Sequence, residues 1–405
     1  MRLNVSMSTP LHEMAREEIS KQLPFLSRAI SHVGFSADAR TIECDVPDAQ
    51  ADALRRDIKA MADEVQRSLR GLQRKVVFRS RAVARPVHHQ TDQVDGIHRL
   101  GEGQFALEGL PLRLFNYFDR QFEQLSRRWR AEALLTPALI PSTVLAKCDY
   151  FRSFPQCVTF ATHLEEDASR VNRFRSRHDD LQDLDRETLH EMAPPHTCLS
   201  PALCYHVYHL NEQRTLGAAG RVYAVSGRCF RYESGNLSDL QRLWDFTMRE
   251  IVFLGSRVDV LRSREQVIEQ MTEFMDAHDL AAEIRTASDP FFVAGDNLAR
   301  TYFQLSSETK YEMSLCLPEG NRLACGSFNY HGDFFGRRFA IEVEGAGPMH
   351  SVCVGFGLER WVHAFLAQHG MQPASWPSVV REAPEFSAEP ELQPGGVHEA
   401  TASHV

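Results

Sequence analysis

The stretch CFRYESGNLSDLQRLWDFTMRE, residues 229–250, constrains this chain more than any other. It predicts two strands joined by a polar loop, because aromatic and apolar residues at both ends flank a run rich in Gly, Asn, Ser and Asp. Since side chains alternate along a strand, Phe246, Met248 and Glu250 share one face of the second strand. A carboxylate beside two bulky apolar groups is costly to bury unless it is paired, protonated or bound to a metal. Glu250 therefore needs a partner from elsewhere in the fold.

The first of these two strands carries a cation and an anion on one face. If CFRYES is a strand, Arg231 and Glu233 point the same way and Phe230 and Tyr232 point the other way. On this stretch alone, a surface ion pair is the favoured interpretation.

A third segment, SVCVGFGLERWVHAF, combines a strand-like start with a helical end. Its apolar residues at helical spacing form a stripe for packing, and these are Leu358, Trp361, Val362 and Phe365. Arg360 lies off this stripe and can face a cleft. A GxGxxR pattern by itself more often reflects packing than function.

Composition places the chain among ordinary globular proteins and excludes the fibrous and fully disordered classes. Its 405 residues carry a net charge of -9, and the main basic run, residues 70–85, is interpreted as a solvated helix end and edge strand rather than a nucleic-acid patch. The nine cysteines form no CxxC pair, and the N-terminus lacks the apolar core of a secretory signal. No apolar run reaches the length of a membrane span. We therefore expect a cytoplasmic protein with reduced thiols and no membrane partner.

Three regions are expected along the chain. Residues 1–95 predict a small α+β appendage, with a hairpin at 29–47, a helix at 48–72, a strand KVVFRS and a linker rich in His and Asp. Residues 96–372 predict one large mixed domain. Residues 373–405 are rich in Pro, Glu, Ser and Ala, which predicts a disordered tail.

Together these motifs resemble the class II aminoacyl-tRNA synthetases. FRYES…RLWDFTMRE is similar to their motif 2, GFGLER to their motif 3, and Pro141 stands where motif 1 places a proline at the dimer interface. The intervening TKYEMSLCLPEGNRLACGSFNYHGDFFGRRF resembles the seryl-type members. The resemblance implies an α+β fold, with an antiparallel sheet flanked by helices, and a homodimer.

The resemblance also implies roles for individual residues in forming an acyl adenylate. Three residues match catalytic positions, namely Arg231, Glu233 and Arg360. By this resemblance Arg231 would bind the α-phosphate and carboxylate region. Glu233 would contact the adenine or its neighbourhood, and Arg360 would bind the γ-phosphate. Arg242 would contact the bent triphosphate, with Mg²⁺ bridging phosphates. The remaining ATP-binding positions implied are Leu243, Ala324, Cys325, Gly326 and Ser327.

A zinc site is implied by the same resemblance. Threonyl enzymes and atypical seryl enzymes hold zinc in the amino acid pocket, and the matching positions here are Cys204, Glu250 and Cys353. Two thiolates and a carboxylate leave one coordination position open for the substrate α-amino group. His206 and His209 are the alternative ligands near Cys204. Spacing alone does not suggest zinc.

The chain resembles most the amino acid:[carrier protein] ligases, which keep this atypical seryl-like core but have lost tRNA aminoacylation. The resemblance implies that a small amino acid, glycine or alanine, is adenylated and passed to the phosphopantetheine thiol of an acyl carrier protein, without tRNA. An atypical seryl-tRNA synthetase and a catalytically silent paralogue are the alternatives. Candidate docking segments for the acidic carrier are residues 126–130 and 170–178. A minimal ligase core does not need the appendage.

Overall fold

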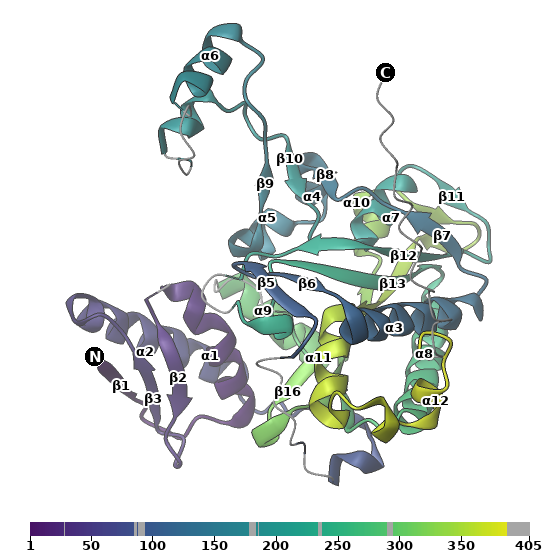
Figure 1. The fold of residues 1–405 in the computed structure, drawn as a ribbon, viewed down its shortest axis with the longest axis horizontal. Helices are drawn as coiled ribbons and strands as arrows, with labels where there is room; N and C mark the ends of the chain where they lie inside the picture. The colour runs from purple at the N-terminus through teal and green to yellow at the C-terminus, as the bar shows by residue number, and fades with distance from the viewer. Residues whose placement is uncertain are drawn as a thin grey trace, which may run out of the picture.

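An eight-stranded sheet organises the fold, in a computed structural model that describes residues 1–27, 29–84, 87, 94–177, 184, 186–233, 237–289 and 295–386 (Figure 1). In spatial order its strands are β4 (Val76–Arg79), β14 (Ala282–Thr286), β15 (Lys310–Cys316), β16 (Arg322–Gly332), β19 (His350–Gly357), β13 (Asp245–Gly255), β12 (Arg221–Phe230) and β7 (Glu132–Leu135). All neighbouring strands are antiparallel except β12 and β7.

The sheet separates two apolar cores, because successive side chains of its inner strands point to opposite faces. On β13, Ile251 and Phe253 enter the first core, whereas Val252 and Leu254 enter the second. The first core is covered by the long helices α3 (Gly109–Arg127), α8 (Arg257–Ala277) and α11 (Leu358–His369). The second is covered by the shorter helices α4 (Ser142–Lys147), α5 (Tyr150–Ser153), α7 (Cys204–Leu210) and α10 (Phe334–Arg338).

The two strands and the helix predicted for the motifs are present. β12 pairs with β13 in register, so that Phe230 opposes Asp245. The first strand is shorter than predicted, because β12 ends at Phe230 and Arg231 lies just beyond it. The predicted apolar stripe of α11, which runs from Leu358 to Phe365, is buried in the first core.

The N-terminal appendage is a separate α+β unit with its own core. Its sheet contains β1 (Arg2–Ser6), β3 (Thr41–Asp45) and β2 (Ser31–Phe35), in that order, and it packs with α1 (Glu13–Leu26) and α2 (Ala51–Ser68). The predicted hairpin and helix are confirmed. The assignment of KVVFRS to the appendage is wrong, because β4 pairs with β14 at the edge of the main sheet.

Smaller elements complete the described part of the chain. Two strands, β5 (Ile97–Gly101) and β6 (Gln104–Leu107), form a hairpin, and six more form two small sheets: β8 (Leu139–Pro141), β10 (Thr197–Leu199) and β9 (Phe160–Ala161), and β11 (Thr215–Leu216), β17 (Glu342–Val343) and β18 (Gly347–Pro348). The helix α6 (Ala168–Arg177) projects from the body, whereas α9 (Gly295–Ser306) lies between the appendage and the sheet (Figure 1).

Residues 88–93 of the predicted linker lie outside the described residues. Among the helices described, none combines the length and apolar character needed to cross a bilayer.

The expectation of disorder from residue 373 is wrong for residues 373–386. Trp376 and Val380, the latter on α12 (Ser378–Arg381), are buried in the first core. The Trp376 indole N–H donates to the Gly370 carbonyl at 2.9 Å. A few apolar side chains thus anchor a segment whose average composition is polar, and the rest of the predicted tail, 387–405, lies outside the described residues.

Neighbouring valines on α12 provide a direct test of this packing. Val380→Ala should lower the free energy of unfolding by about 2 kcal/mol, because it removes two buried methyl groups and leaves a small cavity. Val379→Ala, the same change at a side chain that is 43% exposed, should cost less than about 0.5 kcal/mol. Urea denaturation of both variants measures the difference. Equal effects would contradict the described packing of residues 373–386.

Candidate active site

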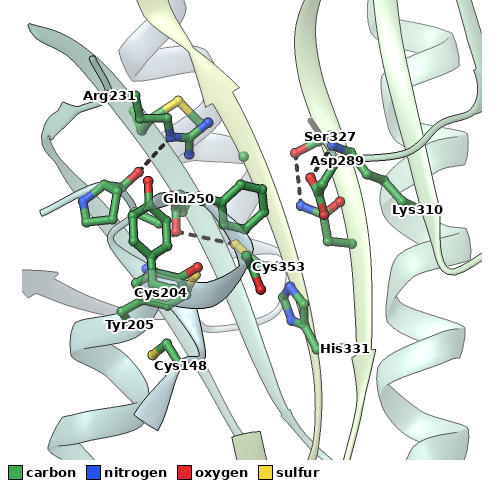
Figure 2. A pocket seen from close by; sticks show the side chains of 18 of the residues that line it. Cys148, Cys204, Tyr205, Arg231, Glu250, Asp289, Lys310, Ser327, His331 and Cys353 are labelled. Atoms are coloured by element: carbon green, nitrogen blue, oxygen red, sulfur yellow. Dashed lines mark hydrogen bonds and ion pairs between the residues drawn. The ribbon is translucent and has the colours of Figure 1, made fainter. Parts of the chain in front are cut away.

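A large pocket opens on the second-core side of the sheet. Its volume is about 1230 Å³, and it is lined by β13, β16 and β19 together with residues of α5, α7, α9 and α10. Phe246, Met248 and Glu250 all line it, as expected if they share one face of β13. Figure 2 shows polar and charged side chains from these elements converging on the pocket.

One end of the pocket is cationic. Arg231 and Arg360 line it, and both are held by backbone carbonyl groups: Arg231 Nε donates to Pro201 O at 2.9 Å, and Arg360 donates through Nε to Gln241 O at 2.7 Å and through Nη1 to Ala324 O at 2.9 Å. Within the described residues, neither forms a salt bridge. Two guanidinium groups held in place by neutral acceptors retain donors and charge for an anion.

The other predicted ATP-binding residues lie in the same pocket or next to it. Glu233, Leu243 and the run from Ala324 to Ser327 line the pocket. Arg242 does not line it but donates through Nη1 to Glu233 Oε2 at 2.9 Å, so that it fixes the Glu233 carboxylate. Every predicted ATP-binding position except Arg242 thus lines the pocket, and residues 234–236 of the connecting loop lie outside the described residues.

The predicted metal ligands form a compact buried group. Cys204 at the start of α7, Glu250 on β13 and Cys353 on β19 place their ligand atoms within 4.8 Å of one another. The Cys353 thiol donates to Glu250 Oε2 at 3.3 Å (Figure 2). The same oxygen accepts from the Cys204 amide at 2.8 Å, and Oε1 accepts from the Leu203 amide at 3.3 Å.

This donor set fits a transition metal with an open coordination position. Thiolates and carboxylates are both zinc ligands, and a catalytic zinc site has three protein ligands with a fourth position left open. A bound divalent cation would also balance the negative charge of the buried Glu250 carboxylate, for which the sequence motif alone supplies no partner. The alternative histidine ligands point elsewhere: His206 contacts Ser200 Oγ at 3.0 Å, and His209 contacts Glu212 at 3.2 Å.

Charged side chains form a wall of the pocket that faces the metal-ligand group (Figure 2). Lys310 binds Asp289 Oδ1 at 2.6 Å and Glu312 Oε1 at 2.9 Å, and all three line the pocket. Burial acts to lower the pKa of Lys310, but the two carboxylates outweigh it and raise the pKa above its usual range. Asp289 follows β14 in a stretch without a motif, so no sequence signal identifies it.

Two neighbouring polar side chains on β16 complete this wall. Asn329 Nδ2 donates to Ser327 Oγ at 3.2 Å (Figure 2). Among the described residues, the buried Oδ1 of Asn329 has no hydrogen-bond partner. Asn329 is the β-sheet partner of Cys353, so this unused acceptor belongs to the strand beside a residue of the metal-ligand group.

The predicted docking segment 170–178 is less cationic than its sequence suggests. Arg173 and Arg177 bind Glu191 at 3.1 and 3.0 Å, and Arg170 binds Glu165 at 2.6 Å. Three of the arginines on α6 are therefore paired with two carboxylates, and His178 lies outside the described residues. In the other candidate segment, Arg127 binds Glu123 at 2.8 Å.

Comparison with known proteins identifies the family. No family model matches the sequence. Amino acid--[acyl-carrier-protein] ligase 1 of Bradyrhizobium diazoefficiens is 30% identical over 309 residues, which cover 74% of this chain and 90% of the relative. Ligase 2 of the same organism is 33% identical over 308 residues, 74% of this chain and 87% of the relative. The chain belongs to the amino acid:[acyl-carrier-protein] ligase family.

This ligase family is related to the type-2 serine--tRNA ligases. The Methanopyrus kandleri enzyme is 27% identical over 297 residues, 70% of this chain and 56% of that protein. Among solved structures, M. kandleri seryl-tRNA synthetase in complex with a tRNA from A. aeolicus has a TM-score of 0.65 at 20% identity, covering 94% of this chain and 76% of that chain. The fold is therefore that of a class II synthetase, as the motifs predicted, and the match extends into the appendage.

Metal content tests the ligand group. The purified wild-type protein should contain about one divalent metal ion per chain. The Cys204→Ala variant should lose most of this metal, because the two remaining ligands would bind it only weakly. Cys198→Ala is the matched control, since Cys198 is equally buried but outside the group. Elemental analysis of the three proteins measures the difference. Full metal occupancy in Cys204→Ala would reject the assignment of Cys204.

Proposed function

We propose that this protein activates a small amino acid with ATP and transfers the aminoacyl group to the phosphopantetheine thiol of an acyl carrier protein. One observation carries the proposal. A single pocket joins a buried Cys–Glu–Cys group to two guanidinium groups that form no salt bridge with any described residue, in a chain 30–33% identical to carrier-protein ligases. Glycine or alanine is the proposed amino acid, on the basis of the family resemblance.

The first step is formation of an aminoacyl adenylate at the cationic end. The substrate carboxylate attacks the α-phosphorus of ATP, the bond to the β-phosphate bridging oxygen breaks, and pyrophosphate leaves. Arg231 is the proposed contact of the α-phosphate and Arg360 that of the γ-phosphate, because fixed donors stabilise charge that develops on phosphate oxygens. Glu233, held by Arg242, is the proposed adenine contact. Mg²⁺ enters with the nucleotide.

The metal-ligand group is proposed to orient the amino acid. Cys204, Glu250 and Cys353 would hold zinc, which supplies a Lewis-acidic position for the α-amino group and so fixes the carboxylate toward the phosphate. The Asn329 Oδ1 acceptor lies on the adjacent strand, where it can accept from the same amino group. The protein groups thus act mainly by orientation.

The second step is transfer to the carrier. The phosphopantetheine thiol attacks the carbonyl carbon of the adenylate, the thiol proton is released, a thioester forms and AMP leaves. A pocket of about 1230 Å³ is larger than most small-ligand sites, which supports simultaneous binding of the adenylate and the end of a pantetheine arm.

A cytoplasmic location is also part of the proposal. All nine cysteines are free thiols, which supports it.

A homodimer is part of the proposal. Leu135 on the sheet-edge strand β7 is 88% exposed, and Leu139 on β8 is 48% exposed. Both precede Pro141 in the region that resembles motif 1. Apolar side chains on an open sheet edge support an interface at this position.

One observation favours a second function, that of a seryl-type tRNA synthetase. The fold shared with a tRNA-bound seryl enzyme covers 94% of this chain and so includes most of the appendage. That likeness concerns the fold alone, whereas the 30% relatives are carrier ligases, so the carrier remains the proposed acceptor.

Substitution of Arg360 tests the catalytic assignment. Arg360→Ala should reduce amino-acid-dependent ATP–pyrophosphate exchange at least 100-fold, because a charge-assisted contact to the transferring phosphates is removed. Arg262→Ala, at an exposed arginine of α8, should leave exchange unchanged. Circular dichroism of both variants checks that they are folded. Normal exchange in Arg360→Ala would refute the motif 3 assignment.

The acceptor is tested by separating activation from transfer. Pyrophosphate exchange with each of the twenty amino acids identifies the substrate, and the labelled amino acid is then offered to a phosphopantetheinylated carrier protein or to total tRNA. Exchange with glycine or alanine and label on the carrier alone is the expected result. Exchange with serine and label on tRNA would establish the synthetase instead, and no exchange with any amino acid would indicate a silent paralogue.

A further inference from the structure

The helix α9 is shared between the appendage and the pocket. Its Leu305 is buried in the appendage core, together with residues of α1 and α2. Arg300, Phe303 and Gln304, on other sides of the same helix, line the pocket. A helix presents different faces at these spacings, so one rigid element forms part of both units.

The pocket face of α9 is bound to the charged wall. Gln304 Oε1 accepts from the Asp289 amide at 2.8 Å, and Gln304 Nε2 donates to Asp289 Oδ2 at 2.7 Å. Asp289 in turn binds Lys310. Through Arg300, which binds Asp149 at 2.6 Å and Ser153 Oγ at 2.5 Å, α9 is also joined to α5 and the residue before it. The helix α9 therefore links α5 to the charged wall.

The appendage also reaches this wall through charged groups of α1. Glu18 is only 2% exposed and accepts from Ser288 Oγ at 3.4 Å, one residue before Asp289. Glu17 binds Arg285 of β14 at 3.2 Å. Burial acts to raise the pKa of Glu312, but Lys310 and, from the appendage, Lys21 hold that pKa below its usual value. An appendage side chain thus acts electrostatically on a pocket residue.

We propose that the appendage is a positioning module for amino acid binding: by packing around Leu305 and contacting Ser288, it holds α9 as a wall of the amino acid end of the pocket. The inference rests on the proposed function for its kinetic consequence. It gives the appendage a role within the same chain, in addition to any contact with a macromolecular partner. Leu305 is a positioning residue, since it touches the appendage core rather than the substrate.

Matched leucine variants test the proposal in the full-length protein. Leu305→Ala should raise the KM for the amino acid in pyrophosphate exchange about fivefold or more, since coupling between linked sites typically changes affinity by a factor of about 5 to 150. The KM for ATP should stay within twofold, because the cationic end is held by other elements. Leu305→Met, which preserves volume, should restore the wild-type value. Leu3→Ala removes the same group from the same core on β1, away from α9 (Figure 1), and should leave both KM values unchanged.

Hydrogen exchange of α9 provides a readout that does not depend on the reaction. Amides of residues 300–306 should exchange faster in Leu305→Ala than in Leu3→Ala or the wild type. An unchanged amino acid KM in Leu305→Ala, or an equal rise in the KM for ATP, would overturn the proposal. If Leu305→Ala does not fold, Lys21→Gln replaces it, with a rise in amino acid KM expected and no rise contradicting it. If the wild type itself lacks exchange activity, the proposed function fails, and protection of α9 that is equal in the two alanine variants would then overturn the positioning role.

Discussion

The site depends on the antiparallel pairing of β13 with β12 on one side and β19 on the other. This pairing places Glu250 diagonally opposite Cys353 on the neighbouring strand, with both side chains on the same face of the sheet. It also places Arg231 just beyond the end of β12. The register is strongly constrained, because a slip of one residue would move Glu250 into the first core and an apolar side chain into the pocket. The packing of Ile251 and Phe253 against the long helices therefore fixes the metal-ligand group as well as the core.

The same arrangement explains how a chain with a net charge of -9 presents a cationic site. Arg231 and Arg360 are oriented by carbonyl oxygens, which accept hydrogen bonds without cancelling the positive charge. Elsewhere arginines such as Arg173 are neutralised by carboxylates. The net charge of the chain therefore does not predict the local charge of a binding site. That local charge depends on whether each guanidinium is held by a neutral carbonyl or by a carboxylate.

Local sequence predicted several elements of the fold, whereas the site residues were predicted through the family resemblance, and the reasons for the exceptions are physical. The strand pair around motif 2 and the α11 stripe follow from alternation and helical spacing. Cys204, Glu250 and Cys353 lie far apart in the chain, and only the family resemblance brought them together. The disorder predicted from residue 373 was wrong up to 386 because composition averages over a segment, whereas a few buried apolar side chains, among them Trp376 and Val380, anchor it. Asp289 and α9 carried no signal, since their importance comes from tertiary contacts.

The edge strand β4 has a consequence for how the chain folds. Arg79 pairs with Glu283, so that about 200 residues separate the two partners in sequence. Contacts of such long range form slowly, because closing the intervening loop costs conformational entropy before any contact is gained. The appendage, with local contacts between residues 2 and 69, should collapse first and leave the β14 edge of the main sheet uncovered. Until β4 pairs with β14, that edge can pair with strands of other chains. The extent of aggregation during refolding should therefore depend on the rate at which β4 pairs with β14.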